Sequence, residues 1–504
     1  MKRREFIKRV VIGGAGTAAA ASALYVLPRE KTRKKNNYNV LFIIADDLKP
    51  QLGCYGETQM VTPHIDRLAS QGMVFERSYC QQALCAPSRA SLLTGLRPDS
   101  TGIYDLNNPV QDKLPNHITL PAYFKQNGYE TVSIGKIFHH HNDSPGAWSK
   151  PPYFIKGAEY VTAEGLRLVD ENRKLNPTLK WAFGAPFEMA DAPDNMYKDG
   201  KLTDYALKEM AGLKEKPFFL CVGYQKPHLP FVAPKKYWDL YDPAKIKLPA
   251  NPFPPAKAPS YSLLDSQELR SFLGIPKEPG RPVPDDMARR LIHGYYACVS
   301  FLDAQVGRLM HQLETLHLKE NTIVVFWGDN GWKLGTHGSW CKHSNFEDDT
   351  RVPLIVSVPG MKTAGKHTNA LVESVDIYPT LCELCGLDLP AQPIEGTGFV
   401  PLLDNPNLEW KKAAFSQYPR GYLDKIDSLL MGYAMRTNQY RYVEWRKFKT
   451  GQLLERELYD HQTDPGENVN VIADPKYAAA IKELEQVMKP NASGGKKPFR
   501  EKVS

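Results

Sequence analysis

Short apolar runs rich in β-forming residues alternate with helical patterns along most of this chain. The clearest runs are Val40–Ala45, Thr131–Ile134, Phe218–Val222, Thr322–Trp327 and Leu354–Val358. Amphipathic helical spacing lies between them, as in Ile65–Gln71, Pro121–Asn127 and Tyr295–Leu316. This alternation is typical of α/β proteins, in which helices connect the strands of a largely parallel sheet and cover its faces. We therefore predict an α/β domain built on a large mixed or parallel sheet flanked by helices.

The alternation is interrupted in two places and changes towards the C-terminus. Residues 140–200 and 248–284 carry Pro and aromatic residues without a regular period, and such loops over a rigid sheet usually shape a binding site. Beyond residue 403 we expect short strands, such as Gly432–Arg436 and Tyr440–Glu444, and a last helix near Tyr477–Met488. The predicted organisation is a main domain (36–403), a smaller C-terminal α+β subdomain with a short antiparallel sheet (404–490) and a basic tail (491–504).

Residues 1–35 have the features of an export signal followed by a basic linker. Arg3 and Arg4 form a twin-arginine pattern, the weakly apolar run Val10–Ala23 follows, and its last residues are the small ones that signal peptidase prefers. A general secretory signal and an uncleaved anchor are the alternatives. We expect the bacterial twin-arginine (Tat) export machinery as a partner, a periplasmic or secreted location, and no stable membrane span after processing.

Charge and cysteine content exclude further classes of protein. Of the 64 basic and 56 acidic side chains, residues 1–35 carry 10 and 2, which accounts for the whole net charge of +8. The folded body therefore has no overall basic excess, and nucleic acid is not an expected partner. The 8 cysteines are sparse and lack the paired spacing of a zinc site, which argues against a disulfide framework or a cysteine-ligated zinc centre.

Polar side chains follow four of the predicted strands at the point where each strand ends. Each group alone could be a helix cap, a turn or a solvated loop. Because ligands bind at the carboxyl ends of the strands in open α/β sheets, the four groups together predict a functional site at this edge. The groups are Asp46-Asp47, Gly135-Lys136 with His139, Lys226-Pro227-His228 and Gly328-Asp329-Asn330.

These side chains divide into two chemical sets. One set offers only oxygen ligands, which suits calcium or magnesium rather than zinc. Its members are Asp46, Asp47, Asp329 and Asn330. The other set is cationic or able to become so, and consists of Lys136, His139, His228 and, later in the chain, Lys342. A hard cation beside several basic side chains indicates a site for a phosphate or sulfate ester.

The segment from residue 85 to 95 reads CAPSRASLLTG and fits the type I sulfatase signature, Cys-x-Pro-Ser-Arg-x-x-x-Leu-Thr-Gly, at every fixed position. The chain resembles the formylglycine-dependent sulfatases over nearly its whole mature length, and within them the iduronate-2-sulfatase branch. The resemblance implies an alkaline-phosphatase-like fold with residues 36–403 as the catalytic domain. It also rests on ADDLKP at 45–50, GKIFH at 135–139, VGYQKPH at 222–228 and WCKHSNF at 340–346.

The resemblance implies the nucleophile and the metal. Cys85 would be converted to formylglycine (3-oxoalanine) by a formylglycine-generating enzyme, and Arg89 would hold the hydrated gem-diol. One hydroxyl of the diol would attack sulfur while the metal lowers its pKa, and the other would let the covalent sulfate leave by elimination. A helix is expected to begin near residues 87–90, so that its amino end favours an anion at residue 85. One Ca²⁺ ion would bind to Asp46, Asp47, Cys85, Asp329 and Asn330.

The remaining roles also follow from the resemblance. Lys136 and Lys342 would neutralise sulfate oxygens, His228 would protonate the leaving alkoxide, and His139 would take the proton from formylglycine as sulfate leaves. The iduronate branch has His where this chain has Asn330, which bears on the substrate rather than on the reaction.

The sequence leaves the substrate and two alternative functions open. The resemblance implies a 2-O-sulfate of a uronic acid or hexose in a sulfated polysaccharide or its oligosaccharides, either a glycosaminoglycan or an algal polymer such as ulvan. A formylglycine-dependent phosphodiesterase or phosphonate monoester hydrolase of the same superfamily is the nearest alternative. A degenerate, non-catalytic carbohydrate-binding protein is the other, although it would be expected to have lost Cys85, Arg89 or a metal carboxylate.

Overall fold

The computed structural model describes residues 38–140, 143–178, 183–265, 267–421, 425 and 427–488. The predicted export signal and the basic tail lie outside these residues. All described residues belong to one unit, Lys35–Ser504. Within the described segments, no helix combines the length and the apolar character that a membrane span requires.

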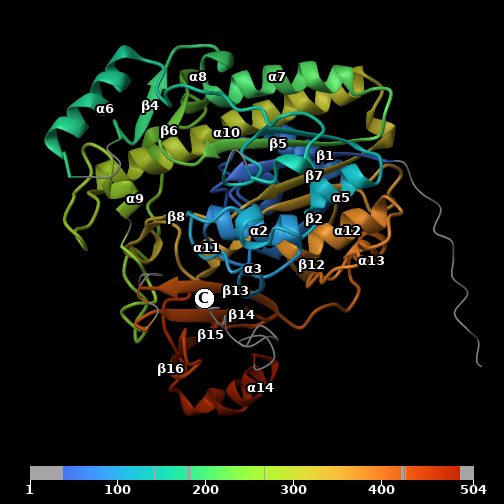
Figure 1. Ribbon diagram of the computed structural model, residues 1–504. Coiled ribbons are helices and arrows are strands. Elements are labelled where there is room, and N and C mark those ends of the chain that lie inside the picture. The colour runs from blue at the N-terminus through green and yellow to red at the C-terminus, as the bar shows by residue number, and fades with distance from the viewer. Residues whose placement is uncertain are drawn as a thin grey trace, which may run out of the picture. The chain divides into compact units, whose positions relative to one another are not determined.

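An eight-stranded mixed sheet, in the order β10-β2-β11-β7-β1-β5-β3 with β12 beside β2, forms the centre of the fold (Figure 1). Its parallel half consists of β1 (Asn39–Asp46), β3 (Glu130–Gly135), β5 (Phe218–Pro227) and β7 (Thr322–Gly328). The other half consists of β2 (Met73–Tyr79), β10 (Arg351–Val352), β11 (Leu354–Ser357) and β12 (Lys366–Glu373). The predicted large sheet is confirmed. The run Leu354–Val358 supplies β11, which runs antiparallel to β7, so the sheet is the mixed form of the predicted fold.

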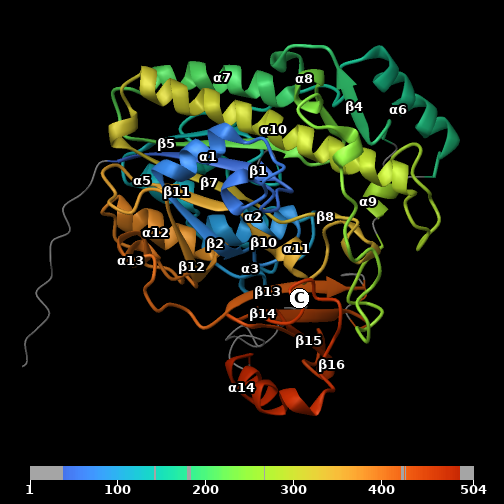
Figure 2. The ribbon, with the colours of Figure 1, turned by 180° about the vertical axis from the view of Figure 1, so that it is seen from behind.

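Helices cover both faces of this sheet because its central strands are apolar on both sides. Along β1, Leu41 and Ile43 lie in one hydrophobic core and Val40, Phe42 and Ile44 lie in the other, and all five are fully buried. The first core is closed by α1 (Pro63–Gln71), α7 (Lys198–Gly212) and α10 (Asp285–Thr315), as Figure 2 shows. The second is closed by α2 (Cys85–Thr94), α5 (Leu120–Gln126) and α12 (Ile377–Leu384).

Short elements lie in the connections between the main strands. The short helices are α3 (Pro98–Thr101), α4 (Val110–Lys113), α8 (Lys235–Trp238), α9 (Gln267–Arg270), α11 (Glu347–Thr350) and α13 (Val400–Asp404). A longer helix, α6 (Ala163–Leu175), lies in one of the two predicted surface excursions. The short strands are β4 (Phe187–Ala190), β6 (Phe231–Pro234), β8 (Lys333–Leu334) and β9 (Trp340–Cys341).

The C-terminal segments form a second, four-stranded antiparallel sheet, as predicted. It consists of β13 (Ala414–Arg420), β14 (Leu430–Arg436), β15 (Tyr440–Lys447) and β16 (Leu453–Asp460), in that order. The last helix, α14 (Ala478–Met488), packs on this sheet through Leu484 and Met488, which share a core with Met435, Tyr442 and Leu458. The two sheets are joined by hydrogen bonds, such as the one from the backbone N–H of Phe415 in β13 to Glu373 Oε1 in β12 at 3.2 Å.

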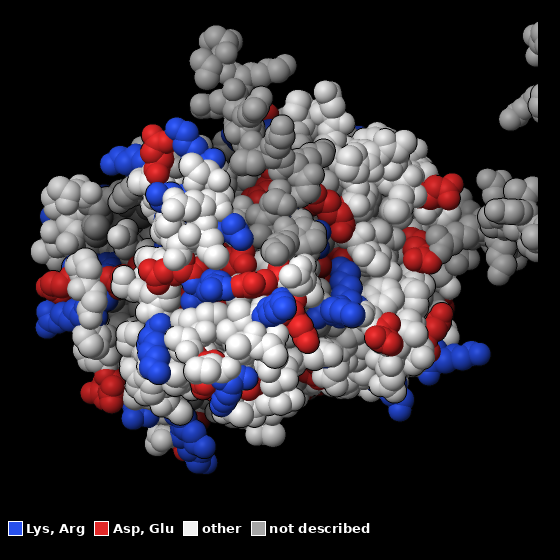
Figure 3. Space-filling view, turned by 90° about the horizontal axis from the view of Figure 1, so that it is seen from below, with Lys and Arg blue, Asp and Glu red and all other residues white. Residues whose placement is uncertain are grey.

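On the face seen in Figure 3, acidic and basic side chains are interspersed rather than sorted by sign. All of the cysteines lie in described segments, and each is free.

Candidate active site

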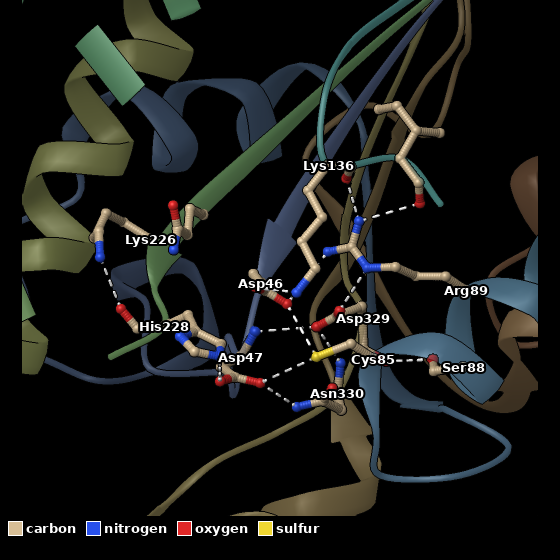
Figure 4. Close-up of polar contacts among 12 residues, drawn as sticks. Asp46, Asp47, Cys85, Ser88, Arg89, Lys136, Lys226, His228, Asp329 and Asn330 are labelled. Carbon is tan, nitrogen blue, oxygen red and sulfur yellow. Dashed lines mark hydrogen bonds and ion pairs between the residues drawn. The ribbon is translucent and has the colours of Figure 1, made fainter. Parts of the chain in front are cut away.

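Two neighbouring parallel strands bring three carboxylates together at their carboxyl ends (Figure 4). β1 ends at Asp46 and is followed by Asp47, and its hydrogen-bonded neighbour β7 is followed by Asp329. Asp329 Oδ1 accepts the backbone N–H of Asp47 at 3.0 Å and that of Asn330 at 2.8 Å. Asp47 has a φ of +62°, a conformation that costs a non-glycine residue energy and often marks a functional position. All three carboxylates are fully buried.

Cys85 is the first residue of α2, and its sulfur lies between Asp46 and Asp47 (Figure 4). Its Sγ is 3.3 Å from Asp46 Oδ1 and 4.0 Å from Asp47 Oδ1. The helix therefore begins slightly earlier than the predicted residues 87–90, and residue 85 lies at its amino end as expected. Burial and the Asp46 carboxylate raise the pKa of the Cys85 thiol well above its ordinary value, so the unmodified side chain stays protonated.

Arg89, one turn further along α2, ties this helix to three strand ends. Its Nε donates to Asp329 Oδ2 at 2.7 Å, and its second terminal nitrogen donates to Asp46 Oδ1 at 3.4 Å. The other terminal nitrogen donates to the carbonyls of Lys136 and Ile137, just beyond β3. Because the guanidinium is fully buried and each nitrogen has a partner, it fixes residue 85 against the carboxylates.

Two lysine side chains pair with the first two carboxylates. Lys136, which follows β3, places its Nζ 2.7 Å from Asp46 Oδ2, and Lys342, which follows β9, places its Nζ 2.7 Å from Asp47 Oδ2. Although burial lowers the pKa of both ammonium groups, the carboxylates raise it above the ordinary value, so both lysines are charged. The residues on either side of Lys342 have φ values of +67° and +90°, so a strained backbone holds this lysine in place.

His228, which follows β5, has an acceptor at each ring nitrogen. Its Nδ1 lies 2.5 Å from the carbonyl oxygen of Leu229, and its Nε2 lies 3.1 Å from Glu268 Oε1 and 3.7 Å from Asp47 Oδ2. An imidazole that faces oxygen acceptors at both nitrogens is satisfied only when both carry a proton. Burial lowers the pKa of His228, but Asp47 and the other nearby carboxylates raise it by a larger amount, so the net shift is upward.

Glu268 is a member of this cluster that the sequence reasoning missed. It lies on α9, in the excursion 248–284, and its Oε2 is 3.1 Å from Lys342 Nζ. Burial raises the pKa of its carboxyl group, but Lys342 and His228 hold it well below the ordinary value, so Glu268 is ionised. The only signal in the sequence is its place in a loop expected to shape the site.

His139 lies apart from this hydrogen-bonded cluster. Its Nδ1 is buried and has no hydrogen-bond partner among the described residues. It lines a cavity of about 350 Å³ together with Lys136, Glu159, Lys198 and Gln225. Burial and the Lys136 ammonium lower the pKa of His139 to about 3, so its imidazole is neutral.

Lys226, which was grouped with the strand ends, is turned away from the carboxylates (Figure 4). Its Nζ donates to the carbonyls of His228 at 2.9 Å and Pro230 at 2.8 Å. It therefore supports the loop that carries His228. Apart from Lys226 and His139, the residues predicted for the site come together: Asp46, Asp47, Cys85, Arg89, Lys136, His228, Asp329, Asn330 and Lys342.

The donor set fits a hard divalent cation. Ligand atoms of Asp46, Asp47, Cys85 and Asp329 all lie within 4.8 Å of one another. The amide nitrogen of Asn330 donates to Asp47 Oδ1 at 2.7 Å and to the Gly331 carbonyl at 2.9 Å, which leaves Oδ1 of the amide as its free end. That oxygen is fully buried and has no hydrogen-bond partner in the described part of the chain. A buried acceptor beside three carboxylates is what a calcium or magnesium ion would satisfy.

Two models of known protein families match this chain. A family model described as Sulfatase matches residues 38–387. A second model, described as N-sulphoglucosamine sulphohydrolase, C-terminal, matches residues 335–493. Together the two models span almost all of the described residues.

Individual proteins show the same likeness. The iduronate 2-sulfatase of Mus musculus is 36% identical, and the alignment covers 88% of this chain and 93% of the relative. The phosphonate monoester hydrolase of Agrobacterium radiobacter has a similar structure, with a TM-score of 0.73 at 23% identity over 91% of this chain and 96% of that one. A protein solved in complex with its substrate D-glucosamine-2-N,6-O-disulfate gives a TM-score of 0.72 at 24% identity over 92% and 99% of the two chains. The alkaline-phosphatase-like fold and the resemblance to the iduronate-2-sulfatase branch are confirmed.

Proposed function

Since the chain belongs to the sulfatase family, we propose that it is an exported enzyme that removes 2-O-sulfate from a uronic acid or hexose of a sulfated polysaccharide or its oligosaccharides. The family makes it a sulfuric ester hydrolase. The observation that carries the proposal is the position of Cys85 at the amino end of α2, beside three buried carboxylates and within a ring of cationic side chains. Such a site suits the two charged parts of the reaction, a metal cation and a sulfate anion.

The environment of Cys85 supports modification to formylglycine. Reactive cysteines work as thiolates, whereas the Cys85 thiol donates to Asp46, and burial beside that carboxylate raises its pKa. The thiol itself is therefore a poor nucleophile in this site. Formylglycine at residue 85 would supply a hydrated aldehyde as the nucleophile, and Arg89, with all its nitrogens bound, would hold residue 85 in place.

Calcium is the cation that this donor set suits best. Asp46, Asp47, Asp329 and the free amide oxygen of Asn330 are hard oxygen donors, and no histidine is among them. The ion would neutralise part of the carboxylate charge and lower the pKa of the attacking hydroxyl. Lys136 and Lys342 would bind sulfate oxygens beside it.

The two histidines of the site have opposite protonation states, which supports different roles. His228 faces acceptors with both nitrogens and is a proton donor, so it suits protonation of the leaving sugar oxygen. His139 is neutral because burial and the Lys136 ammonium lower its pKa to about 3, and its Nδ1, unpartnered among the described residues, is open to a proton from residue 85, for which so low a pKa makes it a weak base. Paired groups whose pKa values are pushed apart are typical of acid–base catalysis.

The substrate proposal rests on the relatives. The Mus musculus relative is named iduronate 2-sulfatase, which points to a 2-O-sulfated uronic acid, and a structural neighbour was solved with a sulfated glucosamine. We propose a sulfated saccharide of this kind as the substrate of the present chain. Formylglycine-generating enzyme and the Tat machinery are the partners that maturation and export would require.

Removal of calcium is expected to abolish sulfate release, and Asn330→Ala is expected to weaken calcium binding by at least about 10-fold, because one ligand oxygen is lost. Isothermal titration calorimetry on the EGTA-treated protein measures the affinity directly, and readdition of Ca²⁺ but not Zn²⁺ should restore turnover. Asn107→Ala, on an exposed loop, is the matched control. Equal calcium affinity for Asn330→Ala and the unmodified sequence would remove Asn330 from the metal site.

A further inference from the structure

The carboxylate of Glu268 bridges the two cationic side chains on the outer side of the site. Its oxygens lie 3.1 Å from His228 Nε2 and 3.1 Å from Lys342 Nζ. Asp47, a proposed metal ligand, contacts the same two groups, at 3.7 Å and 2.7 Å. Because Nδ1 of His228 is taken by the carbonyl of Leu229, Nε2, beside Glu268 and Asp47, is the nitrogen that would donate to the oxygen of a bound ester. The oxygen that leaves with the sugar must therefore come close to Glu268.

Exposure separates the entrance of the site from its floor. The side chains of Glu268 and His228 are 20% and 23% exposed, whereas those of Lys342 and Asp47 are 3% and 0% exposed. The sulfate group would lie on the floor, among the metal ligands and the lysines. The sugar ring that carries it would then lie at the entrance, against His228 and Glu268.

The segment around Glu268 is held firmly in place. The next residue, Leu269, is buried in the main core, and Arg270 pairs with Asp265 at 2.8 Å. Arg270 also donates to the carbonyl of Pro276 at 2.7 Å, which closes the loop behind α9. Glu268 is therefore a fixed part of the entrance, and a substrate has to fit its carboxylate.

We propose that Glu268 is a specificity-determining residue that accepts a hydrogen bond from the substrate hydroxyl on the carbon next to the sulfated carbon. The inference deepens the proposed function and rests on it. An ionised carboxylate only accepts hydrogen bonds, and His228 and Lys342 use two of its roughly four lone-pair sites. Gauche oxygens on adjacent ring carbons lie about one hydrogen-bond length apart. A hydroxyl beside the ester oxygen therefore comes within reach of the carboxylate that touches Nε2.

The same carboxylate would exclude an anionic substituent at that position. A second sulfate on the neighbouring carbon would place like charges side by side, which strongly disfavours binding. The substrate class is thus a saccharide in which the scissile sulfate is next to a free hydroxyl. For a 2-O-sulfated uronic acid this hydroxyl is the one on carbon 3.

The test compares three probes on the matured, calcium-loaded enzyme. The probes are a 2-O-sulfated uronic acid glycoside with a free 3-hydroxyl, its 3-deoxy analogue and its 2,3-di-O-sulfate. Loss of a hydrogen bond to a charged group is expected to lower kcat/KM for the 3-deoxy probe by roughly 10- to 100-fold. The disulfate is expected to be at least as poor a substrate.

Two substitutions separate hydrogen bonding from charge. Glu268→Ala should bring the kcat/KM values of the hydroxyl and deoxy probes to within about 3-fold of each other, because neither bond can form. Glu268→Gln keeps an acceptor but removes the charge, so it should retain part of the hydroxyl preference and accept the disulfate better. Glu278→Gln, 64% exposed on the same excursion, is the matched control and should keep the selectivity of the unmodified sequence.

Each outcome decides between the proposals. Equal turnover of the hydroxyl and deoxy probes by the matured enzyme that retains Glu268 overturns the role of Glu268 and leaves the proposed function intact. Unchanged selectivity in Glu268→Ala does the same. No sulfate release from any of the three probes overturns the proposed 2-O-sulfated substrate, and the inference with it. The predicted kcat/KM ratios between the probes, together with their loss in Glu268→Ala but not in Glu278→Gln, support the role of Glu268.

Discussion

Replacement of Cys85 by Ala is expected to lower sulfate release by at least about 10³-fold while leaving the fold intact. The substitution removes the side chain that would become the nucleophile, and the remaining site would only bind the ester. The polar contacts of the Cys85 side chain are those of its Sγ with Asp46 and Asp47. The loss of a small buried group from α2 should therefore change stability much less than activity.

The measurement is initial-rate kinetics on a sulfated saccharide, with thermal unfolding as the check on the fold. Cys54→Ala is the matched control, because this cysteine is only partly buried and lies outside the site. Retained turnover in Cys85→Ala, at a rate within about 10-fold of the unmodified sequence, would refute the nucleophile assignment.

His228→Gln is expected to lower kcat on natural sugar sulfates by about 10²–10⁴-fold, and to affect p-nitrophenyl sulfate far less. A sugar alkoxide is a poor leaving group and needs the proton that Nε2 of His228 supplies, whereas p-nitrophenolate leaves unprotonated. Gln keeps a polar group of similar size near Glu268 but cannot donate an acidic proton. The ratio of the two losses therefore reports on proton donation, not on binding.

His367→Gln is the control for this comparison, since His367 is 44% exposed and pairs with Glu76 outside the site. Its activity on both substrates should match that of the unmodified sequence. Equal losses on the sugar sulfate and the aryl sulfate in His228→Gln would contradict the general-acid role.

The position of the site could be predicted from the sequence because parallel strands end at one edge of the sheet. Asp46 and Asp329 are far apart in the chain, yet β1 and β7 are neighbours, so their following residues meet. The same reasoning placed Lys136 and His228 beside them, after β3 and β5. The start of α2 at Cys85 also agrees closely with the expected helix.

Strand direction and irregular strands could not be predicted in the same way. An apolar run such as Leu354–Val358 indicates a buried strand, but its composition does not reveal whether the strand runs parallel or antiparallel. β2 was not predicted at all. Its apolar pattern is interrupted by Glu76 and Arg77, which are only partly buried, and its pairing with β11 and β12 makes that half of the sheet mixed.

Side chains supplied by loops were the least predictable part of the site. Lys342 follows a two-residue strand and is held by left-handed backbone on both sides, so only the resemblance to sulfatases indicated its role. Glu268 lies in an excursion whose path over the site depends on the packing of Leu269 in the main core and on the local contacts of Arg270. His139 was expected in the cluster and instead lines the adjoining cavity without a partner at Nδ1 among the described residues.

The most direct test of the account is sulfate release from a panel of 2-O-, 4-O- and 6-O-sulfated oligosaccharides. The protein would be matured by a formylglycine-generating enzyme, loaded with calcium and compared with Cys85→Ala. Release is expected from the 2-O-sulfated members, with none from the Cys85→Ala variant. No release from any member, with formylglycine at residue 85 verified by mass spectrometry, would contradict it and direct attention to phosphodiester and phosphonate substrates.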